Sequence, residues 1–332
     1  MEQFLSTIDD LEARIGKTPN LAKLKTIDHL DEGALTWLAA SPLMMASFGG
    51  KEGIGVTFGA AAPGWVSGNS AELQIPAAMI DDPDMARTGV SFGSFFMIPL
   101  INELLRVNGR VIGNDGEVIH IAVQECYLHC GKALLRSKFW QTGSAVQSPT
   151  TLDQVFDSAR FLALGTIDAN GYADISPKGD PARAMVQLDT DMLWFADRPG
   201  NKRIDSFRNI VSQPHVAAIV MIPGSPYVAR LVGTARISDD PVIRTRFAVQ
   251  EKVPALVTAI SDLSVELMQS DALVRAASWI ATPVPPDVEP ARITLAHLKL
   301  NNNLEAQQAA AAMSEPGFVE QKMQEDYKKN LY

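Results

Sequence analysis

The chain has 332 residues, of which 46% are hydrophobic and 20% are charged, a balance typical of a globular protein and not of a disordered one. This length corresponds to about two domains. Its 38 acidic residues outnumber the 29 basic ones, for a net charge of −9, and the basic residues are scattered along the sequence. Such a charge distribution argues against nucleic acid as a partner.

Cysteine content and hydropathy indicate a location for the protein. Cys126 and Cys130 are the only cysteines, which excludes a disulfide framework and fits a reducing compartment. Residues 1–16 form an acidic amphipathic stretch without the basic start and apolar core of a signal peptide, and no apolar run reaches about 18 residues. We therefore expect a soluble, cytoplasmic protein with no membrane partner.

Two pairs of similar segments indicate an internal duplication. Residues 97–109 and 221–233 share a Met-Ile-Pro start and an Arg-x-x-Gly end, 124 positions apart. Residues 132–140 resemble residues 271–279 at an offset of 139, so the second copy carries an insertion of 15 residues between the two blocks. We predict two homologous domains and a helical C-terminal arm that packs on a neighbouring chain, with boundaries at residues 1–145, 150–300 and 301–332.

The second copy reads as short strands with one short helix. An Asn-Gly turn at residues 168–171 predicts a hairpin, and the helix is expected to end before Pro214. From about residue 241 to 281 the pattern predicts helix. The expected strands cover residues 161–167, 172–176, 192–195, 215–222 and 228–237. This series predicts a small closed β-barrel in a mainly β protein with some helix (α+β).

The strongest candidate site is the basic turn at residues 198–203, between a strand and a helix. Gly200 lets a ligand approach the backbone, Asn201 can cap the helix, and Arg198, Lys202 and Arg203 supply positive charge. These features suit a phosphate group. A solvated basic turn with a capped helix is the alternative interpretation.

A second candidate lies where the preceding hairpin ends, at Ser176, Pro177 and Lys178. Ser176 and Lys178 could bind a ligand ring or phosphate, with Asp180 orienting Lys178. The alternative is a surface Pro/Gly turn carrying an ion pair.

Residues 161–181 and 194–210 together resemble the FMN-binding split-barrel flavoproteins of the pyridoxamine 5′-phosphate oxidase-like superfamily. The resemblance implies a six-stranded split β-barrel that pairs with a second barrel and holds FMN in the groove between them. It also implies which residues contact FMN. Around the phosphate it places Arg198, Asn201, Lys202 and Arg203, and along the ring or ribityl chain Ser176, Pro177 and Lys178.

The first copy resembles the same superfamily over residues 104–110 and 129–140, the late strand and closing helix of one of its subfamilies. In the paired barrels of this superfamily, the closing segment of one barrel is expected to reach the flavin held by the other. This predicts further cofactor contacts from Lys132, Arg136, Ser137 and Trp140, although Trp140 could equally pack the helix onto the barrel. Lys178 and Arg136 are the predicted catalytic residues, as cations that stabilise reduced flavin or an anionic substrate.

The two copies have lost complementary features. Residues 77–84 of the first copy are acidic where the second copy has its basic turn, and would repel a phosphate. Lys132 and Ser137 become Asp271 and Ala276 in the second copy. We therefore predict one FMN site per chain in an intrachain pseudo-dimer, although a head-to-tail arrangement of two chains would use the same residues.

The motifs of other enzyme classes are missing from the sequence. It contains no G-x-G-x-x-G and no G-x-S-x-G motif. Cys126, His129 and Cys130 would share one face of a helix and could bind a metal with His120, but no second ligand pair follows, so we expect no metal.

These observations predict an FMN-dependent oxidoreductase acting on a small organic molecule, with NAD(P)H or oxygen as its redox partner. A homodimer formed through the C-terminal arm is also expected. The alternatives are a non-catalytic protein that binds a flavin or a tetrapyrrole, and a deazaflavin-dependent reductase of the same fold.

Overall fold

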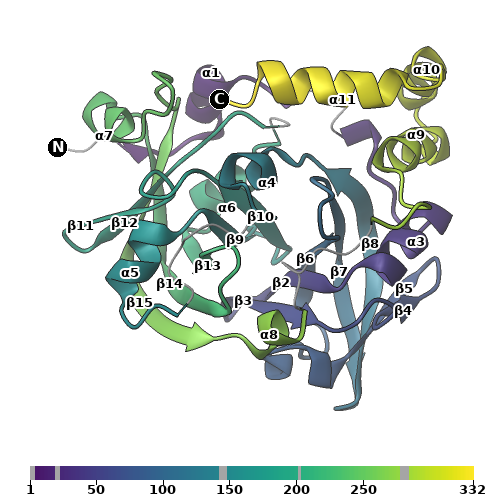
Figure 1. Cartoon of the computed structure of the whole chain (residues 1–332), viewed down its shortest axis with the longest axis horizontal. Coiled ribbons are helices and arrows are strands. Elements are labelled where there is room, and N and C mark those ends of the chain that lie inside the picture. The colour runs from purple at the N-terminus through teal and green to yellow at the C-terminus, as the bar shows by residue number, and fades with distance from the viewer. Residues whose placement is uncertain (1–3, 19–22, 142–147, 201–202, 277–283) are drawn as a thin grey trace.

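The computed structural model describes residues 4–18, 23–141, 148–200, 203–276 and 284–332 (Figure 1). Two antiparallel sheets follow one another along the chain. The first has the order β3-β2-β6-β7-β8-β5-β4, with strands β2 Leu43–Gly50, β3 Gly53–Ala60, β4 Ser67–Gly68, β5 Glu72–Pro76, β6 Ser91–Met97, β7 Leu104–Asn114 and β8 Val118–His129.

The second sheet has the same order, β10-β9-β13-β14-β15-β12-β11, and β1 Phe4–Leu5 adds to β14. Its strands are β9 Phe161–Ile167, β10 Ala173–Gly179, β11 Gln187–Asp189, β12 Met192–Ala196, β13 His215–Met221, β14 Tyr227–Ser238 and β15 Val257–Gln269. Each of the seven strands in this order therefore has a counterpart in the first sheet, as a tandem duplication requires.

Two predictions for the second copy differ from the structure: the closed barrel and the helix in place of its last strand. Among the described strands, β10 and β11 are the two edges of the sheet, so the barrel is split and the prediction of a closed barrel is wrong. The prediction of helix over residues 241–281 is also wrong for residues 257–269, which form β15. Leu263, Val265 and Leu267 alternate there with exposed polar residues, a strand period that places them against the core.

The inserted residues lie in the connection between the last two strands of the second sheet. Residues 115–117 join β7 to β8, whereas residues 239–256 join β14 to β15 and include helix α7 Pro241–Arg246. The difference between these connections accounts for the predicted 15-residue insertion.

The remaining helices surround the sheets, and several begin at a side-chain cap such as Thr7 or Asp31. They are α1 Ile8–Ile15, α3 Glu32–Ala40, α4 Lys132–Ser137, α5 Leu152–Ser158, α6 Asp205–Ser212, α8 Asp271–Ala276, α9 Pro290–Leu300, α10 Leu304–Ala312 and α11 Phe318–Lys329, with short 3-10 turns at Ala77–Met79 and Pro83–Met85. None of the helices in the described ranges is both long and apolar enough to span a lipid bilayer.

The two halves pack face to face through one shared hydrophobic core, as an intrachain pseudo-dimer. Val56 and Phe95 of the first sheet belong to the same buried cluster as Phe161 and Ile219 of the second. Phe95 and Phe161 meet edge to face with ring centroids 6.4 Å apart. The halves are therefore fixed relative to each other, which allows a binding site to be built from both.

The chain ends cross between the halves. β1 and α1 pack on the second half, where Leu11 enters the core, while Ile293 of α9 enters the core of the first half. The C-terminal arm then packs on its own chain, and α11 runs along one side of the molecule from α10 towards α1 (Figure 1). The homodimer expected through this arm stays a prediction.

Candidate functional site

A cavity of about 560 Å³ lies where α4 of the first half meets β10, the end of β12 and the start of α6 in the second half. The structure thus brings together segments that the sequence analysis singled out in different halves. The predicted site residues that line it are Lys132, Arg136, Ser176, Pro177, Lys178, Arg198 and Arg203.

Two other predicted residues, Ser137 and Trp140, do not line the cavity. Asn201 and Lys202 lie outside the described residues. The Ser137 hydroxyl donates to the Leu134 carbonyl within α4, at 3.0 Å. The Trp140 indole donates to the Ile101 carbonyl at 2.8 Å and packs on Phe139, so it joins the closing helix to the barrel.

Arg198 is held by an ion pair that the sequence analysis did not expect. Its Nε donates to Asp180 Oδ2 at 2.7 Å, and its Nη2 donates to the Phe247 carbonyl at 2.7 Å. Burial raises the pKa of Asp180 to about 6, although Arg198 opposes this shift. The expectation that Asp180 orients Lys178 is therefore wrong: Asp180 lies beyond the end of β10 and faces the basic turn.

Lys178 has a different carboxylate partner. Its Nζ lies 3.5 Å from Asp197 Oδ1 and 5.2 Å from the centre of the Phe207 ring. Burial raises the pKa of Asp197, and the nearby Lys178 acts against this shift. The side chain of Lys178 keeps 15% of its exposure at the cavity wall, so its ammonium group remains accessible to a ligand.

Arg203 connects the basic turn to the first half. Its Nε donates to Asp205 Oδ2 at 2.8 Å, and its Nη1 donates to the Thr26 hydroxyl at 3.1 Å. The guanidinium also lies 4.3 Å from the centre of the Tyr127 ring. These contacts hold the turn against the first half, in addition to any contact Arg203 makes with a ligand.

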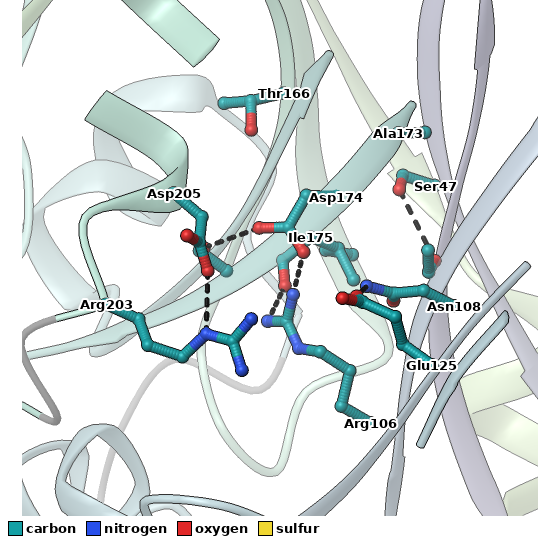
Figure 2. Close-up of polar contacts among 12 residues, drawn as sticks. Ser47, Arg106, Asn108, Glu125, Thr166, Ala173, Asp174, Ile175, Arg203 and Asp205 are labelled. Atoms are coloured by element: carbon teal, nitrogen blue, oxygen red, sulfur yellow. Dashed lines mark hydrogen bonds and ion pairs between the residues drawn. The ribbon is translucent and has the colours of Figure 1, made fainter. Parts of the chain in front are cut away.

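Figure 2 shows a neighbouring contact that the sequence analysis missed, from Arg106 of β7 to Asp174 and Ile175 of β10. Arg106 is fully buried and fixes β10 immediately before Ser176. Its counterpart in the duplication, Arg230, crosses in the opposite direction to Asp82 at 2.7 Å. The repeated arginine could have been read as a link between the halves, because a buried guanidinium needs a carboxylate partner.

Arg136 acts as a clamp on the cavity wall. Its Nε donates to the carbonyl of Gly179, the last residue of β10, at 2.9 Å, and its Nη1 donates to the carbonyls of Pro199 and Leu331 at 3.0 and 2.8 Å. The equivalent Arg275 donates to the carbonyls of Ala60, the last residue of β3, and Met79. The same clamp therefore occurs twice, which supports both the duplication and a positioning role for Arg136.

The cavity is rich in basic side chains and lies at a helix start. Among the described residues its lining holds seven lysine or arginine side chains, five of which pair with a carboxylate, and one lining carboxylate, Asp197. Ile204, Ser206 and Phe207 from the first turn of α6 also line it, and no described side chain caps this helix. Backbone N–H groups at the helix start, the helix dipole and the basic side chains of the lining all favour an anionic ligand.

The equivalent position in the other half is occupied by the acidic segment of the first copy. Asp81 accepts hydrogen bonds from the Ser270 hydroxyl and from the backbone N–H of Ala272, at the start of α8. Burial raises the pKa of Asp81, and Asp82 pairs with Arg230. Carboxylates thus occupy the place where the second half presents its basic turn.

The helical face proposed for a metal site is a strand in the structure. Cys126 and His129 lie on strand β8 and not on a helix, so the shared helical face does not exist. No group of three potential ligand side chains with metal-binding geometry occurs among the described residues. Burial raises the pKa of Cys126 and, together with the nearby cations, lowers that of His129 well below its ordinary range, so both are neutral.

Residues 149–281 match the family model of pyridoxamine 5′-phosphate oxidase. These residues, less than half of the chain, therefore form a domain of the pyridoxamine 5′-phosphate oxidase family. No curated protein sequence matches the chain.

Solved structures similar to this chain each cover about one of its halves. HupZ from Group A Streptococcus is 20% identical with a TM-score of 0.30, and covers 36% of this chain and 96% of its own. General Stress Protein 26 from Bacillus anthracis is 12% identical with a TM-score of 0.28, covering 36% and 95%. HutZ, the heme storage protein from Vibrio cholerae, is 13% identical with a TM-score of 0.24, covering 36% and 91%.

Proposed function

We propose that the chain binds one FMN in the cavity between α4 and β10 and acts as an FMN-dependent oxidoreductase on a small organic molecule, with NAD(P)H or oxygen as redox partner. The observation that carries this proposal is the cavity itself. It joins α4 of the first half to the half that matches the family, and it is lined by seven lysine or arginine side chains, five of them in ion pairs. It also includes the start of α6, which no described side chain caps.

The residues present suit FMN. The first turn of α6 and Arg198 would hold the phosphate, because backbone N–H groups and a guanidinium both favour a dianion. Ser176, Pro177 and Lys178 would lie along the flavin ring or ribityl chain, opposite α4. A cavity of about 560 Å³ is within the range of cofactor sites.

FMN, when bound, supplies hydride or electron transfer, and the protein supplies binding, orientation and electrostatics. We assign Lys178 the role of stabilising negative charge that develops at the flavin or the substrate, because its Nζ is a fixed cation at the cavity wall. Arg136 is a positioning residue, since its Nε and Nη1 hold the backbone around the cavity. Neutral His129 is able to donate or accept one hydrogen bond without adding charge.

The test begins with the absorbance spectrum of the purified full chain and mass identification of the ligand that heat releases. We expect FMN, and its reduction under anaerobic conditions by NADH or NADPH, or reoxidation of the chemically reduced protein by oxygen. If heat releases a deazaflavin or a tetrapyrrole instead, the FMN proposal is wrong and the deazaflavin-dependent reductase or the tetrapyrrole-binding protein takes its place. Bound FMN that exchanges electrons with none of these partners would contradict the enzymatic proposal.

A further inference from the structure

A second cavity of about 600 Å³ lies between α11, α9 and the end of β8, next to the first. α11 lies beyond the part of the chain that matches the family model. The cavity wall is mainly apolar, from Leu128, Leu298, Met313, Phe318, Val319 and Met323. Both cavities are lined by His129, Cys130, Lys132, Pro199 and Gly200, so they meet along this set.

Most charged groups at the second cavity have partners. Lys132 pairs with Asp326 of α11 at 2.7 Å, and Lys322 pairs with Glu325 at 3.2 Å. The Tyr327 hydroxyl donates to Glu103 at 2.7 Å, and burial raises the pKa of that carboxyl. These contacts give both carboxylates of the lining, Glu103 and Asp326, a hydrogen-bond or ion-pair partner.

Lys25 is the exception. It lines the cavity but forms no ion pair with any residue that the structure describes. Burial lowers its pKa, and Glu103 opposes this shift from beyond ion-pair distance. An ammonium group at the edge of an apolar space is stabilised by an anion that brings its own apolar surface. The buried Nδ1 of His129 also has no hydrogen-bond partner among the described residues.

We propose that this second cavity binds a small apolar molecule carrying one carboxylate or similar anionic group. Lys25 pairs with the anion, and the apolar body packs against Met313, Phe318 and Met323. The methionines let the wall adapt to different shapes. If the proposed function holds, this molecule is the substrate, because the cavity meets the proposed FMN site at the five lining residues that the two cavities share.

Calorimetric titration of the full chain with 2-naphthoate, and with its neutral analogue 2-naphthamide, tests the proposal. We expect saturable binding of one 2-naphthoate, in preference to the amide. Lys25→Met should weaken the binding of 2-naphthoate at least about tenfold and leave the affinity for 2-naphthamide unchanged. Lys328→Met, an exposed charge on the same α11, should change neither.

A second pair of variants avoids dependence on Lys25 alone. Met323 is half-buried, so Met323→Glu should fold, and its carboxylate should repel the anion. Met323→Gln has the shape of the Glu variant without its charge. It should therefore bind 2-naphthoate more tightly than Met323→Glu does. The proposal is overturned if 2-naphthoate does not bind saturably, if it binds no better than the amide, or if Lys25→Met behaves like Lys328→Met.

FMN content, measured on the same samples, separates this proposal from the proposed function. Binding of 2-naphthoate that depends on Lys25 in a protein unable to bind FMN would support the cavity and contradict the oxidoreductase. Normal FMN binding without Lys25-dependent binding of 2-naphthoate would overturn this inference alone.

Discussion

The paired arginine clamps allow one prediction with a control inside the same molecule. Arg136→Met keeps most of the side-chain stem and removes the three hydrogen bonds to the carbonyls of Gly179, Pro199 and Leu331. Arg275→Met removes two equivalent bonds, both 3.1 Å long, at the equivalent position of the other half. Both variants damage the fold, but Arg136→Met alone alters the proposed cofactor site.

The expected magnitudes follow from burial. Arg136 is only 8% exposed, and hydrogen bonds that involve a charged group contribute about 1.5 to 3 kcal/mol each, so the loss of three should lower the free energy of unfolding by at least roughly 4 kcal/mol. The Arg275 side chain is 33% exposed, and solvent replaces part of what is lost, so roughly 1 to 2 kcal/mol is expected there.

The assay combines urea unfolding with FMN titration, followed by the quenching of flavin fluorescence. FMN should bind at least about tenfold more weakly to Arg136→Met, a loss of about 1.4 kcal/mol, because the backbone at Gly179 and Pro199 is released. FMN affinity should stay at the wild-type value in Arg275→Met. Equal weakening in both variants would show that the effect is a general loss of stability and would refute the positioning role of Arg136.

Further predictions concern the same cavity. Lys178→Met, assayed in FMN-loaded folded protein, should lower the rate of flavin reduction at saturating donor by at least about tenfold; an unchanged rate would remove Lys178 from the catalytic assignment. Burial raises the pKa of Asp180 to about 6, so as the pH falls Asp180 is protonated in the folded protein before it is protonated in the unfolded chain. Its contribution to stability should therefore fall by about 2 kcal/mol as the pH rises from about 4 to 7. Asp180→Asn should abolish this component of the urea-unfolding profile, and an identical profile in the variant would contradict the shift. Gly179→Ala should disrupt the contact of β10 with α4, because a Cβ there would lie 1.9 Å from a carbonyl oxygen of α4, whereas Gly200→Ala meets no atom closer than 3.9 Å; equal melting temperatures for the two variants would refute this packing.

The duplicated architecture was accessible from sequence because its signals are local. The Met-Ile-Pro blocks lie at the ends of β6 and β13, and the two helical blocks are α4 and α8. Their offsets correctly gave the insertion that separates β14 from β15. The strand β15 was missed because it contains good helix formers such as Leu263, Glu266 and Met268, which hide its alternating pattern.

The partners of the site residues were not accessible from sequence. Asp180 and Asp197 are both near the predicted residues, and only the fold decides that the first pairs with Arg198 and the second with Lys178. The contacts of the C-terminal arm were even less predictable from sequence. Arg136 contacts Leu331 across 195 positions, and Lys252 donates to the Tyr332 carbonyl across 80, so no local pattern records that the arm returns to the cavity.

The chain is proposed to hold one FMN, because Asp81 and Asp82 occupy the position equivalent to the proposed site. Equilibrium titration of the flavin-free full chain with FMN, at protein concentrations well above the dissociation constant, measures this number directly. We predict one FMN per chain. Two FMN per chain would contradict the occupied second position, and no binding would contradict the cofactor assignment itself.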